Sequence, residues 1–216
     1  MERLKVGVLI SGRGSNLQAL IEAAADPAYP AEIAIVISNR AEAAGLARAE
    51  AAGIPHQAIA EDDRAAFAAA ADRELRAANV GLVALAGFMR LLDADFVAAW
   101  RDRMVNIHPS LLPAFPGLHP QRQALAAGVK FSGCTVHFVR AEVDSGPIIA
   151  QAVVPVEDGD DEDRLAARIL AAEHRLYPLA VRLFAEGRLK ITGNRVAVTG
   201  GEPPQFVALN PSGVRA

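Results

Sequence analysis

The chain has 216 residues, of which 52% are hydrophobic, and a formal net charge of −3. This composition supports one substantial core and excludes the basic face that a nucleic-acid-binding protein needs. The single cysteine excludes a disulfide within the chain, and the first apolar run is too short for a signal peptide or a membrane span. We therefore expect a cytoplasmic protein with no nucleic-acid or membrane partner.

The first half of the chain alternates strand and helix patterns. Continuous apolar, β-branched runs such as KVGVLI are typical of strands buried on both faces of a parallel sheet. The predicted strands are Lys5–Ile10, Ile33–Ser38, His56–Ile59, Leu82–Ala86 and Met104–Ile107. The predicted helices are Asn16–Ala25, Ala43–Ala52, Arg64–Ala78 and Phe96–Trp100. This alternation predicts an α/β fold with a mostly parallel, doubly wound sheet, which binds ligands outside the carboxyl ends of its strands.

The second half opens with a proline-rich connector after Pro109. The elements predicted beyond it are a short helix at Gln121–Ala127, strands at Thr135–Val139 and Ile148–Val156, a long helix at Arg164–Glu186 and a hairpin at Leu189–Val198. Pro178 predicts a kink or a break in the long helix. We expect a single domain, with a phosphate-binding half at 1–105, a catalytic half at 106–200 and a loose tail at 201–216.

A glycine-rich turn, Ser11–Asn16 (SGRGSN), follows the first strand and opens a helix. Backbone N–H groups at such a helix N-terminus form an anion site. The turn lacks the Gly-Lys-Ser/Thr of a P-loop, and Leu17 stands where a dinucleotide fingerprint needs its third glycine. A terminal phosphate is therefore the expected ligand. The alternative is a plain strand-to-helix turn with Ser15 or Asn16 as the cap.

Asn106 and His108 stand at the carboxyl end of the last parallel strand. Strand alternation places both on one face, and Pro109 ends the strand behind them. An amide can donate to a developing oxyanion, and an imidazole can move a proton near neutral pH. A hydrogen-bonded turn histidine is the open alternative.

For two further residues, the local sequence favours a structural role over a functional one. Asp144 lies in a VDSGP loop, where its carboxylate could orient His108 but where an Asx turn is locally favoured. His137 stands in an apolar strand and is interpreted as a core or supporting histidine.

No metal site is expected, because Cys134 has no nearby cysteine and the acidic run at 158–163 lacks calcium-loop spacing. A nucleophile elbow of the GxSxG type is absent from the sequence.

The stretches SGRGSNLQAL, AGFMRLL and NIHPSLLPAFPGLH, with HFV and DSGPII after them, together resemble the folate-dependent glycinamide ribonucleotide formyltransferases. The resemblance runs from about Lys5 to Lys190. The NIHPSLLP motif is specific to formyltetrahydrofolate-dependent transferases, and the SGxGSN loop points to the glycinamide ribonucleotide branch. The resemblance implies a Rossmann-like formyltransferase fold and an enzyme of purine (IMP) biosynthesis.

The resemblance implies that the enzyme transfers a formyl group from 10-formyltetrahydrofolate to the amine of phosphoribosylglycinamide. The folate is then a consumed cosubstrate, and no metal is needed. The resemblance also implies catalytic roles for Asn106, His108 and Asp144. It implies contacts with the phosphoribosyl substrate at Gly14, Ser15, Asn16 and Glu173. The positions matching the folate pocket are Arg64, Met89, Arg90, Leu91, Leu92, Asn106, Arg140, Ala141, Glu142, Val143 and Asp144. The expected assembly is a monomer or a homodimer.

Two stretches depart from the family pattern. The loop at 140–146 reads Arg-Ala-Glu-Val-Asp-Ser-Gly where Asp-Glu-x-Asp-x-Gly is expected, so Arg140 and Ala141 depart from it, and His119-Pro120-Gln121 replaces a His-Thr/Ala-His connector. Among rival functions, methionyl-tRNA formyltransferases and formyltetrahydrofolate deformylases carry an additional domain, so the chain length leads us to expect neither. A non-catalytic sugar-phosphate-binding protein, which needs the glycine loop alone, is the alternative from another class.

Overall fold

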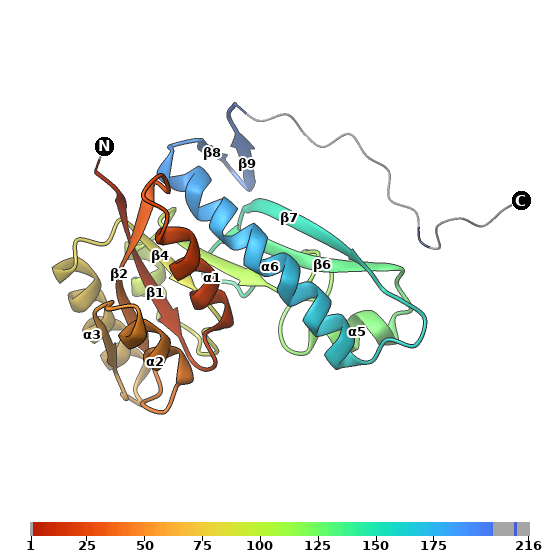
Figure 1. Cartoon of the computed structure of the whole chain (residues 1–216), viewed down its shortest axis with the longest axis horizontal. Helices are drawn as coiled ribbons and strands as arrows, with labels where there is room; N and C mark the ends of the chain where they lie inside the picture. The colour runs from red at the N-terminus through yellow and green to blue at the C-terminus, as the bar shows by residue number, and fades with distance from the viewer. Residues whose placement is uncertain (1, 201–209, 211–216) are drawn as a thin grey trace, which may run out of the picture.

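The computed structural model describes residues 2–200 and residue 210 of the chain. A nine-stranded sheet of order β3-β2-β1-β4-β5-β6-β7-β9-β8 runs through the described residues (Figure 1). The strands are β1 (Leu4–Ile10), β2 (Ala31–Ser38), β3 (His56–Ala58), β4 (Leu82–Leu85), β5 (Met104–His108), β6 (Phe131–Phe138), β7 (Ile148–Pro155), β8 (Leu189–Thr192) and β9 (Arg195–Val198). The helices are α1 (Ser15–Ala24), α2 (Ala44–Ala51), α3 (Arg64–Ala77), α4 (Ala94–Ala99), α5 (Pro120–Ala126) and α6 (Glu162–Ala185). The predicted loose tail at 201–216 lies outside the described residues, apart from Asn210.

The first five strands form the parallel half of the sheet, as their alternation with helices predicts. Each neighbouring pair from β3 to β5 runs parallel. Helices α1, α2, α5 and α6 bury apolar side chains against one face of the sheet, and α3 and α4 cover the other. Figure 1 shows α1 and α6 packed beside each other on the same face. The mostly parallel α/β fold predicted from the sequence is confirmed.

Strands β5 and β6 run antiparallel, and their register decides which polar side chains meet. Asn106 pairs with His137, and His108 pairs with Thr135. Directly opposed residues of an antiparallel pair share a face, as do residues two apart on one strand. These four polar side chains therefore line one face of the sheet, while Ile107 joins the core on the opposite face.

Helix α6 continues without a break through Pro178. Of the kink or break predicted at this proline, the break does not occur. Proline removes one helical hydrogen bond and crowds the carbonyl four residues earlier, but α6 buries a long apolar stripe, with Leu165, Ile169 and Tyr177 all within the core. The packing of this stripe keeps the helix continuous across the proline.

The hydroxyl of Tyr177 ties α6 to the middle of the sheet. It lies 2.9 Å from the carbonyl oxygen of Leu85 and 3.3 Å from that of Val105. Leu85 ends β4 and Val105 lies in β5, so this contact holds the helix at a defined height above both strands. One turn earlier on the same helix, Glu173 is thereby carried to the N-terminus of α1. None of the described helices has a run of apolar residues sufficient to cross a bilayer.

Candidate functional site

The three residues of the predicted catalytic trio gather at the carboxyl end of β5. The strand ends at His108, directly before Pro109. Nδ1 of His108 lies 3.3 Å from Oδ2 of Asp144, and the two side chains are only 7% and 9% exposed. Asn106 lies two residues before His108 on the same face of the strand. The structure therefore brings together residues from a strand and from a distant loop.

His137 connects Asn106 to this pair. Its Nδ1 atom lies 3.0 Å from the carbonyl oxygen of Phe138, so that nitrogen carries the proton. Its Nε2 atom is then free to accept from Nδ2 of Asn106, which lies 3.2 Å away. Burial lowers the pKa of His137, which keeps the ring neutral and able to accept. This hydrogen bond orients the Asn106 amide, so His137 is a buried histidine that supports a neighbouring side chain, as its sequence context suggests.

Both ring nitrogens of His108 face oxygen acceptors. Nδ1 faces Asp144, and Nε2 lies 3.0 Å from the carbonyl oxygen of Phe115. The Gly117 N–H donates to Oδ2 of Asp144 at 2.8 Å. The connector after β5 thus closes around the His108–Asp144 pair.

The 140–146 loop reaches the pair by crossing one face of the sheet. At its base, the Val139 N–H donates to the Met104 carbonyl at 2.9 Å, at the amino end of β5. Further along, Asp144 reaches His108 at the carboxyl end of that strand. Asp144 has a φ of 53°, in the left-handed region that aspartate tolerates better than most residues. The Asp144 carboxylate contacts distant groups, so the alternative of a simple Asx turn does not describe this residue.

The glycine turn after β1 leads into α1 without a side-chain cap. Gly14 is the N-cap residue, with a φ of 70°, and a Cβ atom there would lie 2.7 Å from the Cα atom of Gly45. The close approach and the left-handed backbone both require glycine. Neither Ser15 nor Asn16 caps the helix, so the first-turn N–H groups stay available to an anion.

Asn16 and Glu173 meet where α1 and α6 come together. Nδ2 of Asn16 donates to Oε2 of Glu173 at 2.8 Å. Glu173 is only 5% exposed, and burial raises its pKa. Within the part of the chain that the structure describes, Oδ1 of Asn16 is buried without a hydrogen-bond partner. Two residues that the resemblance assigns to one substrate are therefore in direct contact.

Ser11 joins three of the strand ends that form this edge of the sheet. Its hydroxyl donates to Oδ1 of Asn39 at 2.7 Å and accepts from the Met89 N–H at 2.8 Å. Ser11 follows β1, Asn39 follows β2 and Met89 follows β4. The glycine turn and the 87–92 segment are thus held together by one buried hydroxyl, a role that the sequence alone does not indicate.

The positions matching a folate pocket lie on three surface segments. Met89, Leu91 and Val143 are exposed by 69%, 56% and 56%, unusually high values for large apolar side chains. The Arg90 guanidinium donates to the carbonyls of Glu61 and Asp62, directly before α3. The other positions of the set are Arg64 at the start of α3, Leu92 beside Leu91, and Arg140, Ala141 and Glu142 before Val143.

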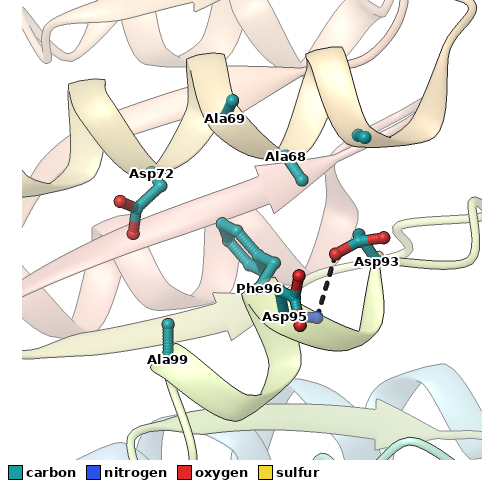
Figure 2. Close-up of a pocket in the computed structure, with 8 residues that line it drawn as sticks. Ala68, Ala69, Asp72, Asp93, Asp95, Phe96 and Ala99 are labelled. Atoms are coloured by element: carbon teal, nitrogen blue, oxygen red, sulfur yellow. Dashed lines mark hydrogen bonds between the residues drawn. The ribbon is translucent and has the colours of Figure 1, made fainter.

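Two cavities lie among the described residues near these segments. One, of about 420 Å³, is lined by Leu112, Pro113, Asp144, Ser145, Gly146, Ile148, Asn194, Arg195 and Val196. It lies between the Asp144 loop and the β8–β9 hairpin. The other, of about 330 Å³, is a groove between α3 and α4 into which Phe96 and Asp72 face (Figure 2). Asp144 lines the first cavity, and neither Asn106 nor His108 is among the lining residues of either one.

Comparisons with known proteins agree with this architecture. The family model described as formyl transferase matches residues 4–181. The phosphoribosylglycinamide formyltransferase of Escherichia coli is 47% identical over 95% of this chain and 99% of its own length. The trifunctional purine biosynthetic protein adenosine-3 of Drosophila pseudoobscura is 52% identical over 95% of this chain, which spans only 15% of that protein. The crystal structure of glycinamide ribonucleotide transformylase 1 from Symbiobacterium toebii superimposes with a TM-score of 0.88, at 55% identity over 91% of this chain and 94% of that one.

Proposed function

The chain belongs to the formyl transferase family, and we propose that it transfers a formyl group from 10-formyltetrahydrofolate to the amine of phosphoribosylglycinamide in purine biosynthesis. The observation that carries this proposal is the buried cluster of Asn106, His108, Asp144 and His137 at a ligand-binding sheet edge. A sugar-phosphate-binding protein that uses the glycine turn alone has no need of this cluster. We place the enzyme in the cytoplasm, as a monomer or a homodimer.

In the proposed reaction, the glycinamide nitrogen attacks the formyl carbon, and a tetrahedral oxyanion forms. The new C–N bond is kept, the bond from carbon to N10 of the folate breaks, and a proton passes from the attacking nitrogen to N10. The second N–H of the Asn106 amide and the His108 imidazolium donate hydrogen bonds to the oxyanion. Each donor of this kind contributes roughly 10²–10³ in rate.

Asp144 supports the charged form of His108. Its carboxylate lies against Nδ1 of the ring in a nearly dry environment, where an opposite charge stabilises the imidazolium. The ring proton on Nε2 is shared with the Phe115 carbonyl before the reaction. A negatively charged oxyanion is a stronger acceptor than a neutral carbonyl. The developing charge therefore draws this proton toward the substrate.

The glycine turn is the proposed phosphate site. The uncapped first turn of α1 presents its N–H groups to the phosphate, at Gly14, Ser15 and Asn16. Glu173 reaches the same place from α6 and is held there by Asn16.

The folate is proposed to bind across the neighbouring segments. The flat faces of its aromatic rings suit the exposed side chains of Met89, Leu91 and Val143, and Leu92, Ala141 and Glu142 complete the walls on the same segments. The main chain around Arg90 and the 140–144 segment supplies hydrogen-bonding groups for the pterin. Arg64, exposed at the start of α3, is placed to attract the glutamate end of the folate.

The decisive experiment measures formyl transfer to phosphoribosylglycinamide by the absorbance of the folate product. We expect Asn106→Ala and His108→Ala to lower kcat by about 10²–10³ each. The matched control is His56→Ala, because this histidine is exposed and bonds only to the Ile54 carbonyl. Near-wild-type turnover by either folded site variant would contradict the proposed roles.

A second arm separates the nearest rival. If formate is released at the same rate with and without phosphoribosylglycinamide, water is the acceptor and the enzyme is a deformylase. For the phosphate site, Ser15→Ala and Asn16→Ala should raise the KM for phosphoribosylglycinamide more than the KM for the folate. The opposite pattern would overturn the assignment of the glycine turn.

A further inference from the structure

Arg140 forms an ion pair outside the catalytic cluster. Its Nη2 atom lies 2.5 Å from Oδ1 of Asp102, in the turn between α4 and β5. The Arg140 side chain is 16% exposed and the Asp102 side chain is 46% exposed. Partial burial of the cation reduces screening by solvent, so this contact is stronger than a fully exposed pair.

Two nitrogens of the Arg140 guanidinium are held by groups of the protein itself. Its Nη1 atom donates to the Val139 carbonyl at 2.9 Å, while Nη2 is held by Asp102. The aliphatic stem lies on the other end of the loop, since a Cβ atom at Gly146 would lie 3.2 Å from Cγ of Arg140. The side chain therefore fastens the base of the loop rather than projecting toward a ligand.

A main-chain hydrogen bond holds the base of the loop beside the Arg140–Asp102 ion pair. The Val139 N–H donates to the Met104 carbonyl at 2.9 Å, and the adjacent Arg140 binds Asp102 two residues before Met104. Asp102 has a φ of 60°, in the left-handed region, and lies in the turn directly before β5. Together these contacts set the direction in which the 140–146 loop leaves the amino end of β5.

The geometry points to Arg140 and Asp102 as a positioning pair that holds the 140–146 loop in the conformation that closes over the folate and places Asp144 against His108. The inference rests on the proposed function, because it assigns the loop to folate. It changes the role of Arg140 from a side-chain folate contact to a residue that acts through the loop. Asp102 acquires a role that no sequence motif indicates.

The test uses variants that keep shape and remove charge. Asp102→Asn preserves a residue that tolerates the left-handed backbone, and Arg140→Met preserves the stem that packs on Gly146. We expect each to raise the KM for 10-formyltetrahydrofolate about three- to ten-fold, as loss of a partly buried ion pair implies. The KM for phosphoribosylglycinamide should change less than about two-fold, since the glycine turn lies at other strands.

The double variant shows whether the two residues act as a pair. If they do, Arg140→Met with Asp102→Asn raises the folate KM no more than either change alone. Arg140→Lys, which keeps a positive charge, should recover part of the affinity. Independent, multiplying effects of the two changes would overturn the inference, as would unchanged folate KM values. Arg168→Ala is the control, because it breaks another partly buried ion pair, with Asp160 just before α6 and outside the 140–146 loop.

Hydrogen exchange separates failure of this inference from failure of the proposed function. Both single variants should speed amide exchange in residues 140–146, and the control should not. If the wild-type protein transfers no formyl group, the proposed function fails while the exchange result still decides the pairing. If transfer occurs and exchange in this loop is the same in all variants, the pairing is wrong.

Discussion

The side-chain amide of Asn106 donates a hydrogen bond to Nε2 of His137, 3.2 Å away on the neighbouring strand. An amide can rotate about its last torsion, and only a fixed acceptor decides which edge it presents. Because the neutral His137 ring accepts one N–H, the second N–H of Asn106 stays available to a substrate. The neighbouring strand thus sets the orientation of a proposed catalytic donor.

Removing this acceptor should reduce catalysis without unfolding the site. We expect His137→Ala to lower kcat about ten-fold or more, because Asn106 loses its orientation and its full contribution as an oxyanion donor is of this size or larger. Steady-state kinetics with both substrates check this, and the KM values should move little. The exposed His56→Ala variant serves as the control, and equal kcat values for the two variants would contradict the orienting role.

The pH dependence of stability should reveal the buried Glu173. Its pKa is raised by burial, so the folded protein holds the proton at pH values where the unfolded chain has released it. The free energy of unfolding should therefore fall as the pH rises from the ordinary carboxyl value of 4.5 toward the raised value. Glu173→Gln, which keeps an acceptor for Asn16, should flatten this part of the curve. Urea unfolding across that pH range is the measurement, and parallel curves for the two proteins would be the contrary result.

Loss of the Ser11 hydroxyl should weaken folate binding more than phosphate binding. Ser11→Ala removes the acceptor of the Met89 N–H and the donor to Asn39, and each such loss in a half-buried place costs about 1 kcal/mol. We expect the folate KM to rise about five-fold, because the 87–92 segment loses its tie to β1. Tetrahydrofolate binding by calorimetry checks the effect. Ser145→Ala, which loses only a local bond to the Glu142 carbonyl, is a control within the neighbouring loop.

A methyl group at Gly146 should displace the loop that carries Asp144. A Cβ atom there would lie 1.7 Å from the Phe138 carbonyl oxygen, so the main chain has to move. Gly146→Ala should therefore lower kcat and raise the folate KM together. The comparison is Gly12→Ala, where an added Cβ meets nothing within 4 Å. Formyl-transfer kinetics and thermal unfolding are measured side by side. Unchanged folate kinetics in a folded Gly146→Ala protein would contradict close packing at the base of the loop.

The parallel half of the fold follows from local pattern. Its central strands β1 and β4 are largely buried and appear as apolar runs, and the helices between the strands appear as separate stretches. A kink or a break was predicted at Pro178, and the break does not occur, because one proline acts locally while the packing of α6 depends on α1 and the sheet. Tertiary contacts outweighed the local signal there.

The candidate site was predictable only in part. Asn106 and His108 share a face because strand side chains alternate with a period of two, and their spacing of two residues is visible in the sequence. The partnership of His137 with Asn106 depends on the register of two antiparallel strands, and no local pattern encodes a register. The position of Asp144 depends in turn on the path of its loop, so its local sequence suggested a simple turn.

The sequence by itself determined the elements, the shared face of Asn106 and His108, and a glycine turn with a helix behind it, since each of these follows from neighbouring residues. Only the tertiary structure decided that His108 meets Asp144, that Asn16 meets Glu173 and that Arg140 turns to Asp102. Each of these contacts joins residues far apart in the chain. A hydrogen bond acts over about 3 Å, so strand register and loop path together decide which distant groups come within its reach.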